Sequence, residues 1–277
     1  MKRIALIAAA LAIAATAGGG WLFDGKWGKL GSGSGEFRSP VRLAVNAHGA
    51  VYVADWGNGN VQYFTPTGTY LGKWDLRSSV ALAFAPNRWV YQADVDDHRV
   101  RYFDENGSLL GMWGTEGPGE GEFNTPMGIS VGPNRIVYVA DTNNRRIQYF
   151  TYNGSFLGCW GGTDPPGDVA VASSGKVHVA FLPNMGVAVA PDTGYVYFAD
   201  YYNHRIRYFT GNGSFLGMFG SEGPGDGEFK EPSDVAFSAS GARLYVADTG
   251  NYRVQYFNRN EPVVAPTSLG RVRALFR

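Results

Sequence analysis

The chain has 277 residues, of which 14% are aromatic and 17% are charged, a composition that is typical of a globular protein and too apolar for a disordered one. Lys and Arg together number 24, as do Asp and Glu, so the formal net charge is zero. Because a phosphate backbone selects a basic protein surface, this balance excludes nucleic acid as an expected partner.

The first 17 residues have the pattern of a secretory signal. Lys2 and Arg3 form the charged start, residues 4–14 form the apolar run, and Ala-Thr-Ala at 15–17 provides the cleavage site. The apolar run is too short to predict a membrane span. We therefore expect a protein that is secreted or held in the periplasm or cell envelope, with residues 18–22 as a linker. An uncleaved N-terminal anchor is the alternative.

A phrase of β-type sequence recurs through residues 23–262. It reads Val-Tyr-x-Ala-Asp, or a close variant, and begins at residues 51, 90, 137, 177, 196 and 244. In the clearest unit, apolar runs at 127–131, 136–140, 147–150 and 156–160 are separated by turn sequences such as Pro-Asn and Asn-Gly. We name these runs strands A, B, C and D. Four antiparallel strands repeated about every 40 residues are typical of a β-propeller blade.

The number of strands predicts an all-β, six-bladed propeller in which the fourth blade is truncated. Strand A recurs near residues 41, 80, 127, 168, 186 and 234, whereas strand C has only five copies. The repeat phrases that begin at 177 and 196 are too close together for strands C and D to fit between them. Strand Val177–Phe181 is therefore expected to be an exposed sheet edge that can pair with another chain.

The two ends of the repeat region are expected to meet. A segment that resembles strand D, residues 23–27, precedes the first strand A, while the last blade lacks a strand D after Phe257. We therefore predict that the N-terminal segment supplies the outer strand of the last blade and closes the ring, which removes two free sheet edges.

Four segments resemble NHL repeats: Tyr-Val-Ala-Asp-Thr-Asn-Asn-Arg-Arg-Ile-Gln-Tyr-Phe at 138–150, the matching residues 199–209, and the glycine-rich loops 117–123 and 223–229. The resemblance covers about residues 23–257 and implies a six-bladed β-propeller. It does not imply one activity, because the family includes RNA binders, sensor and adhesion modules, scaffolds and a lyase. Two positions depart from the pattern: Phe181 stands where other copies have Asp, and Asn60 stands where they have Arg.

Asp and Arg residues that recur in the turns between strands B and C are interpreted as structural. An Asp at the end of strand B accepts hydrogen bonds from turn amides, and its repetition in successive blades favours this role over a carboxylate array. The residues assigned to this role are Asp55, Asp94, Asp141, Asp200, Asp248, Arg99, Arg146, Arg205 and Arg253.

No group of residues predicts a catalytic or metal centre. The A strands lack histidine and offer mainly Val, Ala, Gly and Met to the central channel, so a zinc site there would lack ligands. No cofactor is expected. Calcium is kept as an alternative, because two glycine-rich loops carry oxygen ligands, although not at the spacing of a known calcium loop: Glu116, Glu120 and Glu122 in one, Glu222, Asp226 and Glu228 in the other.

The B–C turns differ most between copies and are the predicted binding face. Exposed aromatic and Arg side chains dominate recognition surfaces, and several occur in these turns: Trp56, Arg145, Tyr201, Tyr202 and Tyr252. The alternative is that each side chain only caps its own blade.

We therefore predict an exported, non-enzymatic propeller that binds a protein, peptide or glycan on the face formed by its B–C turns and D–A loops. One alternative is a hydrolase or lyase, lactonase-like or amidating-lyase-like, that acts in the central channel. A second is a structural envelope component that associates through the edge at Val177–Phe181. The basic tail at 263–277 departs from the repeat, and no role is assigned to it.

Overall fold

The computed structural model describes residues 16–17, 20–75, 79–181 and 186–260. Most of the predicted signal segment and the whole predicted tail, 263–277, lie outside the described residues. Within the described part of the chain, no helix is long and apolar enough to cross a membrane.

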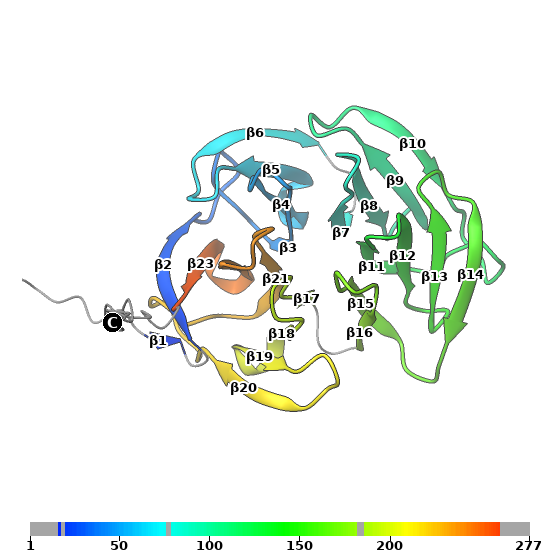
Figure 1. Cartoon of the computed structure of the whole chain (residues 1–277). Coiled ribbons are helices and arrows are strands. Elements are labelled where there is room, and N and C mark those ends of the chain that lie inside the picture. The colour runs from blue at the N-terminus through cyan, green and yellow to red at the C-terminus, as the bar shows by residue number, and fades with distance from the viewer. Residues whose placement is uncertain (1–15, 18–19, 76–78, 182–185, 261–277) are drawn as a thin grey trace, which may run out of the picture.

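The strands form antiparallel sheets arranged in a ring, so the predicted all-β propeller is confirmed (Figure 1). The first three complete blades are blade I (β3 Pro40–Val45, β4 Val51–Asp55, β5 Asn60–Phe64, β6 Tyr70–Asp75), blade II (β7 Ser79–Phe84, β8 Val90–Asp94, β9 Arg99–Phe103, β10 Leu109–Trp113) and blade III (β11 Pro126–Val131, β12 Ile136–Asp141, β13 Arg146–Thr151, β14 Phe156–Gly161). The half-blade follows (β15 Pro166–Val171, β16 Val177–Phe181), and then blade IV (β17 Val187–Val189, β18 Val196–Asp200, β19 Arg205–Phe209, β20 Phe215–Phe219) and blade V (β21 Pro232–Phe237, β22 Arg243–Asp248, β23 Arg253–Arg259, β2 Trp21–Trp27). The described residues thus form five complete blades and one two-stranded sheet in the place where the truncated blade is predicted.

The predicted ring closure is confirmed. Strand β2 pairs antiparallel with β23, with Phe23 opposite Phe257 and Trp27 opposite Val254. A two-residue strand, β1 (Thr16–Ala17), pairs with the outer edge of β2. Trp21 at the start of β2 is fully buried and donates a 3.3 Å hydrogen bond from Nε1 to the hydroxyl of Tyr197 in blade IV. The closing strand is therefore part of the core between two blades.

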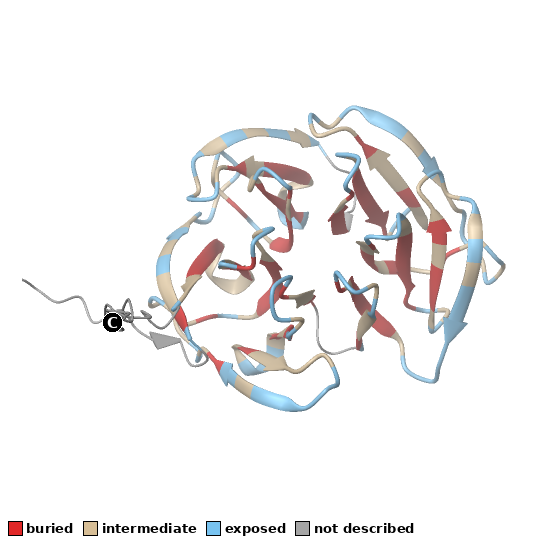
Figure 2. Cartoon of the chain, in the orientation of Figure 1, coloured by how far each residue is buried: buried red, intermediate tan, exposed pale blue. Residues whose placement is uncertain are grey.

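The core lies between neighbouring blades, and the outer strands are the most exposed (Figure 2). Tyrosines of strands B and C stack within a blade, as Tyr52 and Tyr63 do with ring centroids 5.2 Å apart. The strand D residue opposite the strand C tyrosine must be glycine, because a β-carbon at Gly72 would lie 2.4 Å from the hydroxyl of Tyr63. The repeated Gly in strand D is thus explained by aromatic packing.

Candidate functional site

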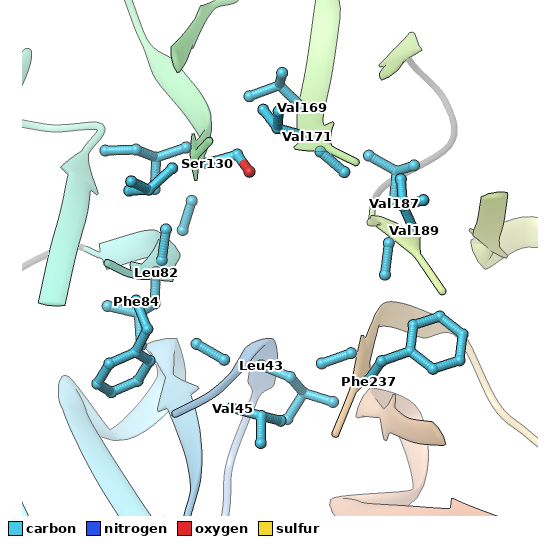
Figure 3. A pocket seen from close by; sticks show the side chains of 18 of the residues that line it. Leu43, Val45, Leu82, Phe84, Ser130, Val169, Val171, Val187, Val189 and Phe237 are labelled. Atoms are coloured by element: carbon cyan, nitrogen blue, oxygen red, sulfur yellow. The ribbon is translucent and has the colours of Figure 1, made fainter. Parts of the chain in front are cut away.

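The A strands surround a central cavity of about 570 Å³. Its wall is mainly aliphatic, with Leu43, Leu82, Val169 and Val187 around it from different strands, while the ring of Phe237 points away from its centre (Figure 3). This part of the channel matches the apolar lining predicted from the sequence.

A charged cluster that the sequence analysis missed also lines this cavity. It consists of Arg42, Asp168 and Asp234, which occupy the same position in β3, β15 and β21, next to the bulge that opens each of these strands. All three side chains are buried. The prediction that the channel offers only Val, Ala, Gly and Met is therefore wrong at one end.

Each carboxylate of the cluster bonds to the backbone of the next A strand around the ring. Asp234 accepts hydrogen bonds from the amides of Leu43 at 2.7 Å and Val235 at 2.8 Å. Asp168 accepts them from the amides of Val187 at 3.1 Å and Val169 at 2.8 Å. The carboxylates thus join adjacent sheets where the strands approach most closely.

Burial changes the acidity of both carboxyl groups. Loss of hydration raises the pKa of Asp168 to about 6 and that of Asp234 to about 7, while the positive charge of Arg42 acts in the opposite direction on both. For Asp234, the nearby Asp168 adds a further upward effect on the pKa. The two acids therefore titrate near neutral pH.

Arg42 closes the channel at the end formed by the B–C turns. Its guanidinium donates to the carbonyl of Ser233 in blade V at 3.2 Å and to that of Met127 in blade III at 3.3 Å. Arg42 lines the central cavity, whereas Met127 and Ser233 line a separate hollow on the outside. The guanidinium therefore lies between the two cavities.

That outer hollow, which we call the loop-face hollow, has a volume of about 390 Å³. Three of the predicted binding residues meet there, Trp56, Tyr201 and Tyr202, from blades I and IV. The other residues around it are Ser39, Val41, Val95, Asp96, Met127, Ser233 and Thr249. Trp56 and Tyr202 are exposed over 61% and 69% of their surface, so a partner can reach both rings.

Part of the wall of this hollow comes from one variable repeat position, the residue after the strand B Asp. In blades III and V this residue is Thr, and its hydroxyl donates to a proline carbonyl of the next A strand: Thr142 to Pro166 at 2.8 Å and Thr249 to Pro40 at 2.7 Å. In blades I, II and IV the position holds Trp56, Val95 and Tyr201, and all three line the hollow. Three blades have thus replaced a structural hydroxyl with an apolar surface.

The remaining predicted binding residues lie outside the hollow. Arg145 and Tyr252 end their turns in the left-handed region, with φ of 54° and 57°. Neither residue lines the loop-face hollow. Of the five predicted binding residues, the structure therefore brings only three together around the hollow.

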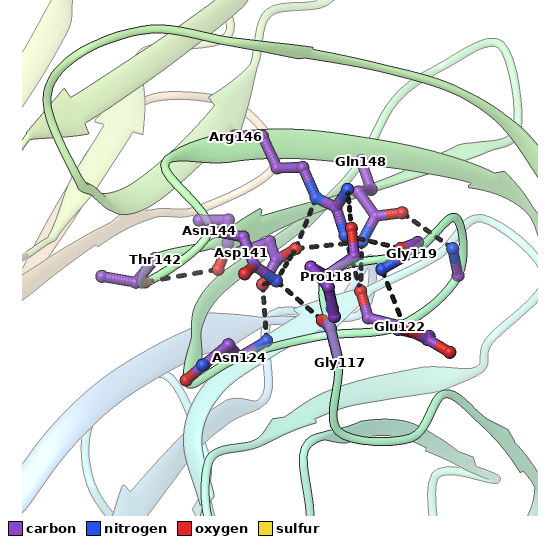
Figure 4. A network of polar contacts seen from close by, with 12 residues as sticks. Gly117, Pro118, Gly119, Glu122, Asn124, Asp141, Thr142, Asn144, Arg146 and Gln148 are labelled. Carbon is purple, nitrogen blue, oxygen red and sulfur yellow. Dashed lines mark hydrogen bonds and ion pairs between the residues drawn. The ribbon is translucent and has the colours of Figure 1, made fainter.

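The recurring Asp residues form the turn networks expected of them. Asp141 is buried and accepts hydrogen bonds from the Asn124 amide, Asn144, Arg146 and Gln148 (Figure 4). The equivalent ion pairs join Arg205 to Asp200 and Arg253 to Asp248, and Asp55 accepts from the amides of Arg38 and Ser39.

Blade II departs from this arrangement. Asp94 pairs with Arg101, two residues beyond the predicted position, while Arg99 donates to the carbonyl of Asp97 at 3.2 Å. Arg99 does lie across the turn from Asp94 in the strand register, as predicted, but the ion pair of Asp94 is made by Arg101. The reason is local: blade II has Arg101 at the strand C position where Gln62, Gln148 and Gln255 stand in blades I, III and V.

Two acids of the glycine-rich loops bond to their own loops, whereas Asp226 pairs with Lys26 of β2. Glu122 accepts from the amide of Gly119 and Glu228 from that of Gly225, both at 2.8 Å. Within the described ranges, no group of three or more His, Cys, Asp or Glu side chains has the arrangement needed to hold a metal ion.

Comparison with known proteins agrees with this architecture. The sequence model of the NHL repeat matches residues 37–64, 123–150 and 229–257, in blades I, III and V. No curated protein matches the sequence.

Several solved structures share the fold. A gluconolactonase from Xanthomonas campestris has a TM-score of 0.64 at 14% identity, covering 81% of this chain and 87% of its own. Hydrazine synthase from Kuenenia stuttgartiensis has a TM-score of 0.61 at 12% identity, covering 82% and 97%. Virginiamycin B lyase from Staphylococcus aureus has a TM-score of 0.57 at 14% identity, covering 80% and 95%. At these identities the likeness is one of fold.

Proposed function

Because this chain belongs to the NHL-repeat β-propellers, whose shared fold does not fix an activity, we propose from its own surface that it is a binding protein whose loop-face hollow receives a segment of another protein. The observation that carries the proposal is the meeting of Trp56, Tyr201 and Tyr202 around one apolar hollow. Large aromatic side chains that border a pocket are the usual anchors of protein recognition.

The chemistry of the hollow favours a peptide segment with an apolar side chain over a sugar. Val41, Val95 and Met127 provide an aliphatic surface, and Trp56 and Tyr202 lie exposed beside it. An aliphatic or aromatic side chain buried there gains free energy from the area removed from water. The Tyr201 hydroxyl donates to a carboxylate oxygen of Glu231 at 3.2 Å, so it can only accept a hydrogen bond from a bound segment.

The lyase and the gluconolactonase of the same fold suggest a second candidate function, catalysis in the central channel. The charged groups of this channel do not favour it, because Asp168 and Asp234 each use both oxygens to accept backbone amides. We therefore place recognition on the outer face.

We further propose that the half-blade counts as the fourth of six blade positions. It has its own A and B strands, with Asp168 at the position of Arg42 and Asp234.

We also propose that the protein works outside the cytoplasm. Cleavage after Ala17 would remove β1 and leave intact β2, the strand that closes the ring. N-terminal sequencing of protein purified from the envelope or medium tests this; an N-terminus at Met1 in cytoplasmic protein would contradict it.

A selection experiment tests the binding proposal. A library of displayed peptides is panned against immobilised protein, and binders to the double variant Trp56→Ala/Tyr202→Ala are removed. We expect the remaining peptides to share a large apolar residue. Equal recovery on both proteins, or recovery of oligosaccharides but no peptides from a parallel array, would contradict a peptide site in the loop-face hollow.

A further inference from the structure

An open groove runs beside the half-blade, in the place where a complete blade has strands C and D. Its volume is about 320 Å³, and it lies between β16 and blade IV. His178 and Phe181 line it from β16, and Phe198, Arg207 and Phe209 line it from blade IV. We call it the half-blade groove.

On the other side of the half-blade, the last Trp of blade III lacks a packing partner that the matching Trp of blades I and II has. Where two complete blades are neighbours, the Trp that ends strand D of one blade packs on the glycine in the C–D turn of the next blade. A β-carbon at Gly107 of blade II would lie 2.6 Å from Trp74 of blade I, and one at Gly154 of blade III would lie 2.6 Å from Trp113 of blade II. Within the part of the chain that the structure describes, no such hairpin lies beside Trp160 of β14, which is 41% exposed.

The wall contributed by blade IV is uncovered in the same way. A β-carbon at its turn glycine, Gly213, would have no atom within 4 Å. Arg207 stands where three other blades have Gln, and its guanidinium lies over the rings of Phe209 and Phe215, 5.0 and 5.7 Å from their centroids. Phe181, at the position of the strand B Asp, is 46% exposed.

We propose that the chain's own C-terminal segment, residues 271–276, docks in the half-blade groove as the missing strand C. This segment reads Arg-Val-Arg-Ala-Leu-Phe. Strand C reads Arg-Val-Arg-Tyr-Phe in β9 (Arg99–Phe103) and Arg-Ile-Arg-Tyr-Phe in β19 (Arg205–Phe209). The end of the chain thus repeats the Arg-Val-Arg that begins β9 and continues with apolar residues, with Ala-Leu where strand C has Tyr-Phe.

Chain length and sheet chemistry support this occupant. The described chain ends at Asn260, after β23 and beside β2, and blade IV lies between this seam and the groove (Figure 1). Residues 261–270 can span about 35 Å when extended. Among the described strands, β16 pairs only with β15, so its other edge presents backbone donors and acceptors to an added strand.

Hydrogen exchange tests the proposal on the whole protein. We compare the full chain with a chain that ends at Asn260 and follow the amides of Val177–Phe181. Docking predicts exchange at least tenfold faster in the shortened chain, with unchanged exchange in β4 and β12. Equal rates in the two proteins would overturn the proposal.

A second comparison tests whether the apolar side chains of the segment, and not only the presence of the tail, protect β16. In the full chain, Val272→Asp/Phe276→Asp is expected to expose β16 as truncation does, whereas Arg277→Ala, the matched control, is not. In the strand C register of β8–β9 and β18–β19, the residue at the strand B Asp position lies opposite the first Arg of strand C. In a Cys159→Ser background, the pair Phe181→Cys and Arg271→Cys is therefore expected to form a disulfide within a monomer. A disulfide found only between two chains, or none at all, would contradict docking within the same molecule.

Discussion

Arg42 on β3 donates a hydrogen bond to the carbonyl of Met127 on β11, at 3.3 Å, although blade II lies between these two strands in the ring. The contact crosses the end of the channel, and the same guanidinium reaches Ser233 in blade V. One side chain therefore ties three blades together and separates the central cavity from the loop-face hollow.

Replacing Arg42 is expected to destabilise the fold. Arg42→Met keeps the length of the side chain but leaves the buried carboxylates of Asp168 and Asp234 without their neighbouring cation, which lowers the free energy of unfolding by about 3 kcal/mol. Urea unfolding measures this change. Arg38→Met, at an exposed arginine on the same face, serves as the control and should have little effect. Equal stability of the two variants would mean that Arg42 does not hold the ring together.

The buried acids predict a pH dependence of stability. Because the folded-state pKa of Asp168 is raised to about 6 and that of Asp234 to about 7, the folded protein binds more protons than the unfolded chain between the ordinary carboxyl range and neutrality. The free energy of unfolding contributed by these groups is therefore largest at acidic pH and is lost as pH rises from about 4 to about 7. Thermal unfolding of Asp168→Asn/Asp234→Asn across this range should show a flatter profile than the wild type; parallel profiles would contradict the assignment.

Two equivalent turn carboxylates should differ in their effect on stability. Asp141 accepts from a backbone amide and three side chains, so Asp141→Ala is expected to lower the free energy of unfolding by about 3 kcal/mol or more. Asp200 accepts from Asn203 and Arg205, and Asp200→Ala should cost about 1–2 kcal/mol. Denaturant titration of both variants checks the order; a larger loss at Asp200 would reverse our ranking of the networks.

Two tryptophans, one in the ring-closing strand β2 and one at the loop-face hollow, are expected to differ in their contribution to stability. Trp21 is 1% exposed, and Trp21→Ala should cost about 3–5 kcal/mol by leaving a cavity beside Tyr197. Trp56 is 61% exposed, and Trp56→Ala should change stability by less than about 0.5 kcal/mol. Melting temperatures of the two variants measure the contrast. A strong loss in Trp56→Ala would indicate a packing role and weaken the case for recognition.

The architecture could be predicted from the sequence because each blade is a local repeat. The Asn-Gly turns, the alternating strands B and C and the missing strand C after Phe181 all lie within short stretches of chain. The seam between β2 and β23 followed from counting strand D, although its partners lie at opposite ends of the chain. Both features rest on periodicity, which sequence alone displays.

The channel cluster could not be assembled in this way. Arg42, Asp168 and Asp234 lie far apart in the chain, and only the ring brings them to one end of the channel. The sequence did carry a signal for the cluster. One strand A position holds a charged residue in these three strands, whereas the other three strands have Ala81, Gly128 and Gly186 there. Likewise, the positive φ of Arg145 and Tyr252 was signalled only by Gly59 at the equivalent turn position of blade I.

The most direct test of recognition at the loop-face hollow is calorimetric titration of one selected peptide into four proteins: the wild type, Trp56→Ala, Tyr202→Ala, and Leu71→Ala as an exposed apolar control on β6. Each substitution in the hollow is predicted to weaken binding at least tenfold, with Leu71→Ala binding like the wild type. Equal affinity in all four proteins would show that the peptide binds elsewhere and would contradict the account.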